Sequence, residues 1–291
     1  MKNENIIVII ILIAVMFLLI THLSTNILEF SRYNTGWNGT SGFFNLPDRH
    51  NTEDIFNTSL LQGRKNTTLL MIAPREKYHA RDLTEYRSFV EEGNTLFLAD
   101  DFGAGNKILQ GIGSSIIIIP GILSSVDRVY NQSYTVVTYP FLDHPINKDV
   151  SSLVLNKGAT LEGGEPLMKT TLMSWIDTDN DGRITKKEYL GKFTVLTHES
   201  IGKGEVFVLS DPSIFTNKMG TIEEKWGNHQ FIRNVIKLNN HLLIDQICSR
   251  TADTDGFSAV MQNMKNYPLF TLLFIGMMFF SLVIIIQKRI L

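Results

Sequence analysis

Two uninterrupted apolar runs at opposite ends of the chain constrain its architecture more than any other feature. The first, IIVIIILIAVMFLLI, occupies residues 6–20 and contains no charged side chain, no glycine and no proline. With the three residues that follow, it reaches about 18 to 20 residues, the length that a helix needs to cross a bilayer. The second run covers residues 267–286. The sequence therefore predicts transmembrane helices over residues 6–23 and 267–286.

The flanks of these runs bear on cleavage and orientation. A cleaved signal peptide is the alternative for the first run, but THLSTNILEF after it lacks a small-x-small cleavage pattern, which favours an uncleaved anchor. Basic residues concentrate on the cytoplasmic side of membrane spans. Lys2 precedes the first run and Lys288 and Arg289 follow the second, whereas Lys265 weakens the asymmetry slightly. We expect cytoplasmic termini, residues 1–5 and 287–291, in a two-pass protein of the cell membrane.

The segment between the runs, residues 24–266, is then expected to be an extracytoplasmic domain. Four N-x-S/T sequons fall within it, at Asn38, Asn57, Asn66 and Asn131, where a glycosylation machinery could reach them. Its charge is balanced, because the chain has 27 Lys and Arg against 29 Asp and Glu. A chain without a broad basic field is a poor partner for nucleic acid. Besides the lipid bilayer, the expected partners are membrane or envelope proteins, and a small-molecule or glycan ligand is left open.

Strand and helix patterns alternate in the central segment. Short apolar runs predict buried strands, and amphipathic segments with capping residues predict the helices between them. This alternation is typical of an α/β domain with a parallel sheet covered on both faces. Residues 31–66 and 120–175 are less readable and suggest loops, irregular strands and an inserted subregion. The predicted strands cover residues 68–73, 95–99, 115–119 and 205–210, and the helices cover residues 83–92, 106–110 and 228–238.

The strongest local motif is DTDNDGRITKKE over residues 177–188, which fits a twelve-residue calcium loop at each constrained position. Calcium prefers about seven oxygen ligands, and glycine at the sixth position permits the sharp turn. Gly182 stands there, and Ile184 is expected to anchor the loop in apolar surroundings. The predicted cofactor is Ca²⁺, held by the carboxylates of Asp177, Asp179, Asp181 and Glu188, the backbone carbonyl of Arg183, and Thr185 directly or through water.

The segments around this loop depart from a full EF-hand. LMKTTLMSWI is only weakly amphipathic, and YLGKFTVLTHE becomes strand-like soon after Glu188. An unpaired extracellular loop with an affinity of about 10⁻⁴ to 10⁻³ M acts as a structural clip that stays loaded, not as a sensor. The plainer alternative is an acidic surface turn without a metal.

A second candidate region lies where two predicted strands end. Asp100 to Asn106 (DDFGAGN) follows one strand, and Ser210-Asp211-Pro212-Ser213 follows another. In open α/β sheets, ligands bind outside the carboxyl ends of the strands, so the two loops are expected to line one cleft. The glycines could form an anion-binding turn, although adjacent carboxylates oppose a phosphate and capping by Asp101 or Asn106 is the simpler role.

Several motifs taken together resemble an uncharacterised membrane family of archaea and bacteria. They are YNTGWNGTSG, FLADDFGAGN, DHPI, GKGEVFVLSDPSIFTNKM and NHQFIRN, and they span most of residues 30–240. The resemblance implies a flavodoxin-like, class I glutamine-amidotransferase-like three-layer fold, also seen in accessory subunits of gliding-motility-type ABC transporters. Family members often sit beside MoxR-type ATPases and transglutaminase-like membrane proteins, which implies a role in envelope-protein maturation.

The amidotransferase chemistry itself requires a nucleophilic cysteine at a strand-to-helix elbow. The single cysteine, Cys248, follows HLLIDQI near the end of the domain, so that chemistry is excluded and a non-catalytic binding or assembly domain is expected. One alternative is a hydrolase that uses Asp101, Asp143 or His144 in the cleft, which convergence of these side chains would favour. The other is an accessory subunit of a transport complex.

Overall fold

A computed structural model of the chain describes residues 15, 25–46, 51–76, 78–223, 225–252 and 276. Contacts divide the chain into two units, and the unit formed by Leu28–Ala252 carries the fold and every site considered below. The predicted spans over residues 6–23 and 267–286 lie outside the described residues, apart from Val15 and Gly276. Among the described residues, no helix combines the length and the apolar character needed to cross a bilayer.

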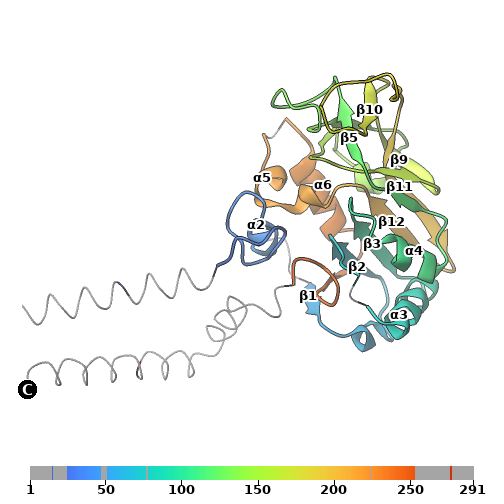
Figure 1. Cartoon of the computed structure of the whole chain (residues 1–291). Coiled ribbons are helices and arrows are strands. Elements are labelled where there is room, and N and C mark those ends of the chain that lie inside the picture. The colour runs from blue at the N-terminus through green and yellow to red at the C-terminus, as the bar shows by residue number, and fades with distance from the viewer. Residues whose placement is uncertain are drawn as a thin grey trace, which may run out of the picture. The chain divides into compact units, whose positions relative to one another are not determined.

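The centre of the unit is one large mixed sheet, and half of it is parallel (Figure 1). Five neighbouring strands run in the order β1-β13-β2-β3-β12, and each pair in this row is parallel. Every residue of β2 and β3 is buried, as expected for strands covered on both faces. This half confirms the strands predicted near residues 68, 95 and 205. Its strands are β1 (Thr52–Ile55), β2 (Thr67–Ile72), β3 (Thr95–Ala99), β12 (Gly204–Leu209) and β13 (His241–Asp245).

The other half of the sheet is antiparallel, which corrects the prediction of a parallel sheet throughout. From β12 the sheet continues through β11, β9, β6 and β7, with β8 and β4 attached beside β11. The predicted strand at 115–119 is β4, which pairs antiparallel with β8 and leaves Ile117 half exposed. Strands β6 to β9 were not predicted, because they lie in the polar segment 120–175. The strands of this half are β4 (Ile117–Ile119), β6 (Val137–Pro140), β7 (Leu153–Val154), β8 (Thr160–Glu162), β9 (Glu165–Thr170) and β11 (Thr194–Ile201).

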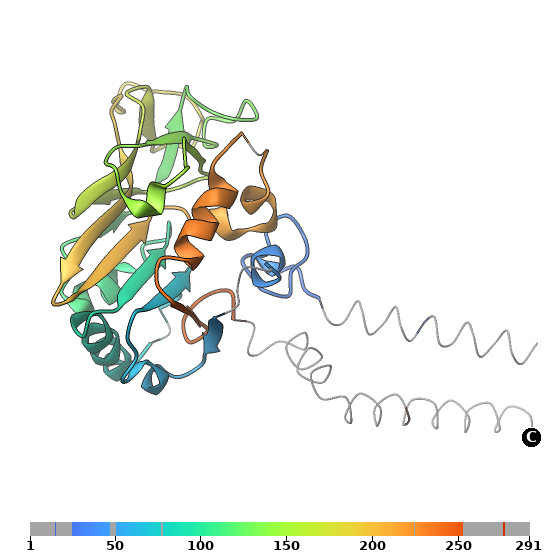
Figure 2. The same cartoon turned by 180° about the vertical axis from the view of Figure 1, so that it is seen from behind.

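Helices cover both faces of the parallel half (Figures 1 and 2). On one face, α3 and α4 pack on Leu96 and Leu98 of β3, and on the other α6 packs with Phe97. Because successive strand residues point to opposite faces, β3 contributes to both cores. The helices are α2 (Ser41–Phe44), α3 (Ala80–Glu91), α4 (Asn106–Ile112), α5 (Asn217–Gly220) and α6 (Asn228–Ile236), with 3₁₀ turns η1 (Thr58–Leu61), η2 (Pro145–Asn147) and η3 (Pro212–Phe215).

A separate two-stranded sheet holds the predicted acidic loop. Strands β5 (Ile122–Ser125) and β10 (Ser174–Asp177) pair antiparallel, with Asp177 opposite Ile122. Ser174 also forms a bridge with Gly191, so the chain leaves β10, makes the loop and returns beside the strand that it left. The loop is therefore tied to the domain at both ends.

Candidate functional site

The acidic loop 177–188 folds around its own carboxylates. The backbone N–H groups of Asp181 and Gly182 donate to the carboxylate of Asp177, at 3.2 and 2.9 Å. At the other end, Glu188 accepts from the backbone N–H groups of Thr178 (2.6 Å) and Thr185 (2.9 Å). Gly182 has φ +72°, the left-handed conformation that the motif requires of glycine there. The first and last residues of the loop thus organise its backbone.

Three carboxylates converge inside this loop. Asp177, Asp179 and Glu188 each offer an oxygen within 4.8 Å of the others, a spacing that could hold a metal ion. Desolvation first, and then the neighbouring charge of Asp181, raise the pKa of Asp179. Hydrogen bonds from Thr178 and Thr185 lower the pKa of Glu188 and keep it ionised. The loop therefore gathers negative charge that a cation would neutralise.

Other predictions for this loop fare differently. Asp181 lies outside the group of three and accepts from the backbone N–H of Arg183 at 2.7 Å. Ile184 is 47 % exposed, which corrects its expected apolar surroundings. A strand, β10, precedes the loop, and residues 189–193 after it contain no helix, so the flanks are not those of a helix-loop-helix hand. Thr185 takes part through its backbone N–H.

The two strand ends predicted to line a cleft do lie together. β3 and β12 are parallel neighbours, so Asp100 and Asp211 emerge at the same edge. Asp100 accepts from the N–H groups of Phe102 (2.9 Å) and Gly105 (2.7 Å), and Asp211 accepts from those of Asn156 (2.6 Å) and Ser213 (2.8 Å). Each of their four carboxylate oxygens thus has a backbone partner. Both residues are fully buried and hold the loops in shape.

This arrangement corrects two expectations for residues 100–106. Helix α4 has Gly105 at its N-cap and no side-chain cap hydrogen bond, so neither Asp101 nor Asn106 caps it, and Asn106 instead exchanges two 2.8 Å hydrogen bonds with the backbone of Ile118. In the glycine turn, the N–H groups of Phe102 and Gly105 donate to Asp100, so they are not available to an anion. The turn is thus satisfied by its own carboxylate.

Asp101 differs from the two aspartates beside it. Its Oδ1 atom is buried and has no hydrogen-bond partner among the described residues. Desolvation, then the charges of Asp211, Asp100 and Glu29, raise the pKa of Asp101 to about 8. The pKa of Asp211 is also raised by burial, to about 6, although its hydrogen bonds oppose the shift. Strongly perturbed carboxyls at a cleft mark candidate functional groups.

Asp101 lines a cleft of about 380 Å³ at this edge of the sheet. Phe102 is 42 % exposed, and the Arg250 guanidinium stacks 3.8 Å from the centre of its ring. The two strand-end segments found from the sequence contribute Asp101, Phe102 and Ser213, and the remaining lining residues come from segments without a recognisable motif. The lining residues are Glu29, Phe30, Asp101, Phe102, Gly121, Ile122, Asn156, Lys157 and Ser213.

The sequence match covers most of this unit. A family model described as a domain of unknown function, DUF4350, matches residues 32–236. This chain belongs to that family. The match confirms the resemblance to an uncharacterised family, and it includes the loop 177–188 and both strand ends of the cleft. A search of curated proteins found no match.

Solved structures similar to this DUF4350 domain are distant. The "mmIFT52 N-terminal domain" has 16 % identity and a TM-score of 0.47, over 64 % of this chain and 81 % of that one. A β-galactosidase from Bacillus circulans sp. alkalophilus has 12 % identity and a TM-score of 0.32, over 53 % and 21 %. Cytoplasmic protein STM1381 from Salmonella typhimurium LT2 has 13 % identity and a TM-score of 0.33, over 67 % and 78 %. These scores are too low to carry an argument.

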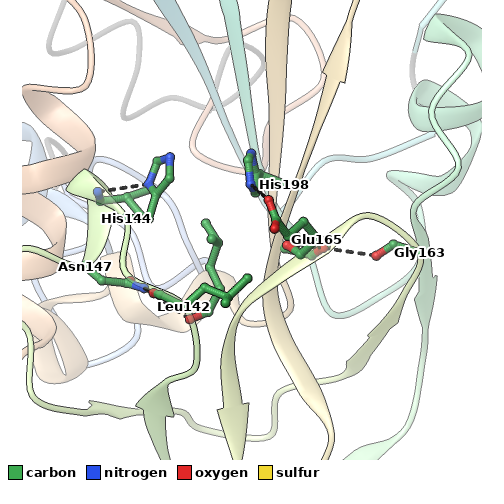
Figure 3. A network of polar contacts seen from close by, with 9 residues as sticks. Leu142, His144, Asn147, Gly163, Glu165 and His198 are labelled. Carbon is green, nitrogen blue, oxygen red and sulfur yellow. Dashed lines mark hydrogen bonds and ion pairs between the residues drawn. The ribbon is translucent and has the colours of Figure 1, made fainter.

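His144 of the DUF4350 domain contacts other groups than Asp101. Its Nδ1 atom accepts from the backbone N–H of Ile146, which caps η2, and its ring lies 5.1 Å from that of His198 (Figure 3). Burial, then the neighbouring His198, lower the pKa of His144. Figure 3 also shows the hydrogen bond between His198 and Glu165, whose Nε2 and Oε2 atoms are 2.8 Å apart. No hydrogen bond, ion pair or ring contact within the described residues joins Asp101 to His144 or Asp143.

Cys248 is held by a buried carboxylate. Asp245 accepts from the N–H groups of Cys248 (3.0 Å) and Ser249 (2.8 Å) and lies 3.3 Å from the Cys248 sulfur. Burial, then the charge of Asp245, raise the pKa of the Cys248 thiol well above its usual value. Because the thiolate is the reactive form, this cysteine is a poor nucleophile.

Proposed function

We propose that this protein is a non-catalytic, membrane-anchored binding or assembly domain of the cell envelope, braced by a calcium ion in the loop 177–188. The observation that carries the calcium site is the convergence of oxygens from Asp177, Asp179 and Glu188 within 4.8 Å. Hard oxygen ligands of this kind suit Ca²⁺. Asp181, the Arg183 carbonyl and Thr185 would complete the shell, as the motif assigns them.

The position of the loop supports a bracing role. Asp177 ends β10, and Glu188 lies three residues before Gly191, whose N–H donates to Ser174 at 2.8 Å. An ion that joins the two ends of the loop would therefore also hold β10 against the returning chain. Binding to the folded state alone stabilises that state by mass action.

Exposed apolar side chains around the same small sheet support a role in binding another envelope protein. Val126 donates its N–H to the Met173 carbonyl, at 3.0 Å, and so lies beside the start of β10. The exposed side chains here are Val126, Leu172, Met173, Tyr189 and Leu190. Apolar groups gathered on a surface mark interaction sites.

The finer fold assignment and the location also belong to this proposal. Five parallel strands with helices on both faces support a flavodoxin-like, glutamine-amidotransferase-like core that antiparallel strands extend. The two apolar runs support anchoring in the cell membrane with the domain outside. The buried Cys248 supports a non-catalytic role.

The test is calcium titration of the full chain in detergent by calorimetry, together with thermal unfolding. We expect binding at about 10⁻³ M or tighter and a higher melting temperature with calcium. Glu188→Gln removes a charged ligand and should weaken binding by about tenfold or more. Glu162→Gln, a change at an exposed glutamate on β8, is the matched control and should bind as the wild type does. Equal binding by Glu188→Gln, or none by the wild type, would contradict the calcium site.

A further inference from the structure

At the cleft beside the carboxyl ends of β3 and β12, one aspartate has a buried oxygen without a partner, whereas two neighbouring aspartates are fully paired. All four oxygens of Asp100 and Asp211 accept backbone N–H bonds, whereas Asp101 Oδ1 is buried without a partner in the described part of the chain. A buried acceptor without a partner costs free energy unless a bound group satisfies it. We propose that this cleft binds the ammonium group of a small organic cation, with Asp101 as its counter-ion.

The charges around Asp101 select a cation. Asp211, Asp100 and Glu29 all disfavour a further negative charge at this carboxyl, and the same field attracts a positive one. The cleft itself is lined by the carboxyl groups of Asp101 and Glu29 and by the ammonium group of Lys157, and Asp100 and Asp211 are buried near Asp101. An ammonium ion brings three N–H donors and no acceptor, so it can pair with Asp101 while its remaining N–H groups donate to water.

A bare metal ion fits this site less well. The oxygens of Asp100 and Asp211 are already used by the backbone, and these aspartates do not form a metal-spaced group with Asp101 within the described residues. One carboxylate alone is a weak site for a divalent ion, which requires several oxygens. The calcium loop lies elsewhere, and the ammonium site does not depend on it.

The walls of the cleft indicate an apolar body beside the ammonium group. Phe102 is half exposed, meets Phe30 edge-to-face with ring centres 6.2 Å apart, and stands with Ile122 along the same cleft. Arg250 covers one face of the Phe102 ring, so the apolar part of a ligand would pack on what remains exposed. A volume of about 380 Å³ accommodates an aromatic or aliphatic amine.

Binding should depend on pH, because Asp101 carries a proton in the empty cleft at neutral pH. Its pKa is raised to about 8, so an ammonium ion must displace that proton to the solvent. The charged groups near it are Asp100, Asp211 and Glu29, with Lys157 and Arg250 on the cleft walls. Affinity should therefore fall by about tenfold for each unit that the pH drops below 8, with one proton released per ligand bound.

The probe is phenethylammonium, titrated into the full chain in detergent by calorimetry at several pH values. Its neutral isostere, 2-phenylethanol, has the same apolar body without the charge. We expect phenethylammonium to bind, with affinity rising from pH 6 to pH 8 and with proton release measured in buffers of different ionisation enthalpy. Asp101→Asn should weaken binding by roughly tenfold to a hundredfold, the effect of losing a charge-assisted hydrogen bond.

Asp149→Asn is the matched control, because Asp149 is exposed and its φ of +59° suits asparagine as well. It should bind as the wild type does. Thermal unfolding establishes that Asp101→Asn is folded before its affinity is compared. Equal binding of 2-phenylethanol and phenethylammonium, an unchanged affinity in Asp101→Asn, or no binding of phenethylammonium would each overturn the proposal. Calcium binding in the same samples reports on the loop separately, so the two sites can fail independently.

Discussion

At the scale of single residues, three aspartates at one sheet edge show how backbone partners decide the role of a carboxylate. Asp100 and Asp211 are buried completely and remain tolerable because backbone N–H groups point at their oxygens. Asp101 lies beside them with its Oδ1 atom unpartnered among the described residues, and its pKa rises to about 8, against about 6 for Asp211. Backbone N–H donors thus distinguish the structural carboxylates of Asp100 and Asp211 from that of Asp101, which is proposed to bind a ligand.

These raised pKa values make the stability of the domain depend on pH. Asp101 titrates at about 8 and Asp211 at about 6 in the folded chain, against an ordinary value of 3.8. The folded state binds more protons between these values, so stability falls as pH rises from about 4 to 8. Asp101→Asn removes one source of this fall, and its melting temperature should exceed that of the wild type by more at pH 9 than at pH 5. Differential scanning calorimetry measures this, and a difference independent of pH would contradict it.

At the scale of elements, the sequence predicted strands most accurately where both faces of the strand are buried. Continuous apolar runs identified β2, β3 and β12, and Gly93, at φ +103°, ends the helical segment after α3. The start of α3 was placed three residues late, because Asp82 caps from inside the helix by accepting from the His79 N–H. The antiparallel strands between residues 120 and 175 alternate polar and apolar residues irregularly, so no period identified them.

The candidate sites divide in the same way. The acidic loop was predictable because its chemistry lies in twelve consecutive residues. The cleft was predictable only as two strand ends, since Phe30, Asn156 and Lys157 reach it from distant segments. The pair of His198 with Glu165 was missed, because strand pairing between β9 and β11 places these residues together. Residues that tertiary packing brings together from distant segments have no characteristic spacing in the sequence, so their site cannot be recognised there.

Two glycines provide a matched test of the acidic loop as an element. Gly182 in the loop and Gly63 after η1 have nearly the same φ, +72° and +71°. Alanine at either position should cost about 1 kcal/mol, because a Cβ atom disfavours the left-handed conformation. Only Gly182→Ala should also weaken calcium binding, by about fivefold to tenfold, since it distorts the turn that presents the ligands. Urea unfolding and calorimetric calcium titration measure both effects, and equal calcium affinity in the two variants would contradict a role for the turn.

At the scale of the whole molecule, the small β5–β10 sheet connects the two candidate sites. Asp177, the first residue of the acidic loop, pairs with Ile122, and Ile122 lines the cleft that contains Asp101. The cleft itself forms where the parallel and antiparallel halves of the sheet adjoin, at the end of β12. The small β5–β10 sheet thus links a loop suited to a cation with a cleft suited to an ammonium group, within the single unit Leu28–Ala252.

The proposed location outside the cell membrane has a direct test, because the chain has one cysteine and it is buried. In a Cys248→Ala background, Tyr189→Cys places a thiol at a position that is 74 % exposed in the domain. A membrane-impermeant maleimide added to intact cells should label this variant, because residues 24–266 are proposed to lie outside. Lys288→Cys, placed in the proposed cytoplasmic terminus, should react only after the membrane is permeabilised. Labelling of Lys288→Cys in intact cells, with Tyr189→Cys protected, would reverse the orientation and remove the basis for a permanently loaded calcium brace, since millimolar calcium is characteristic of extracellular modules.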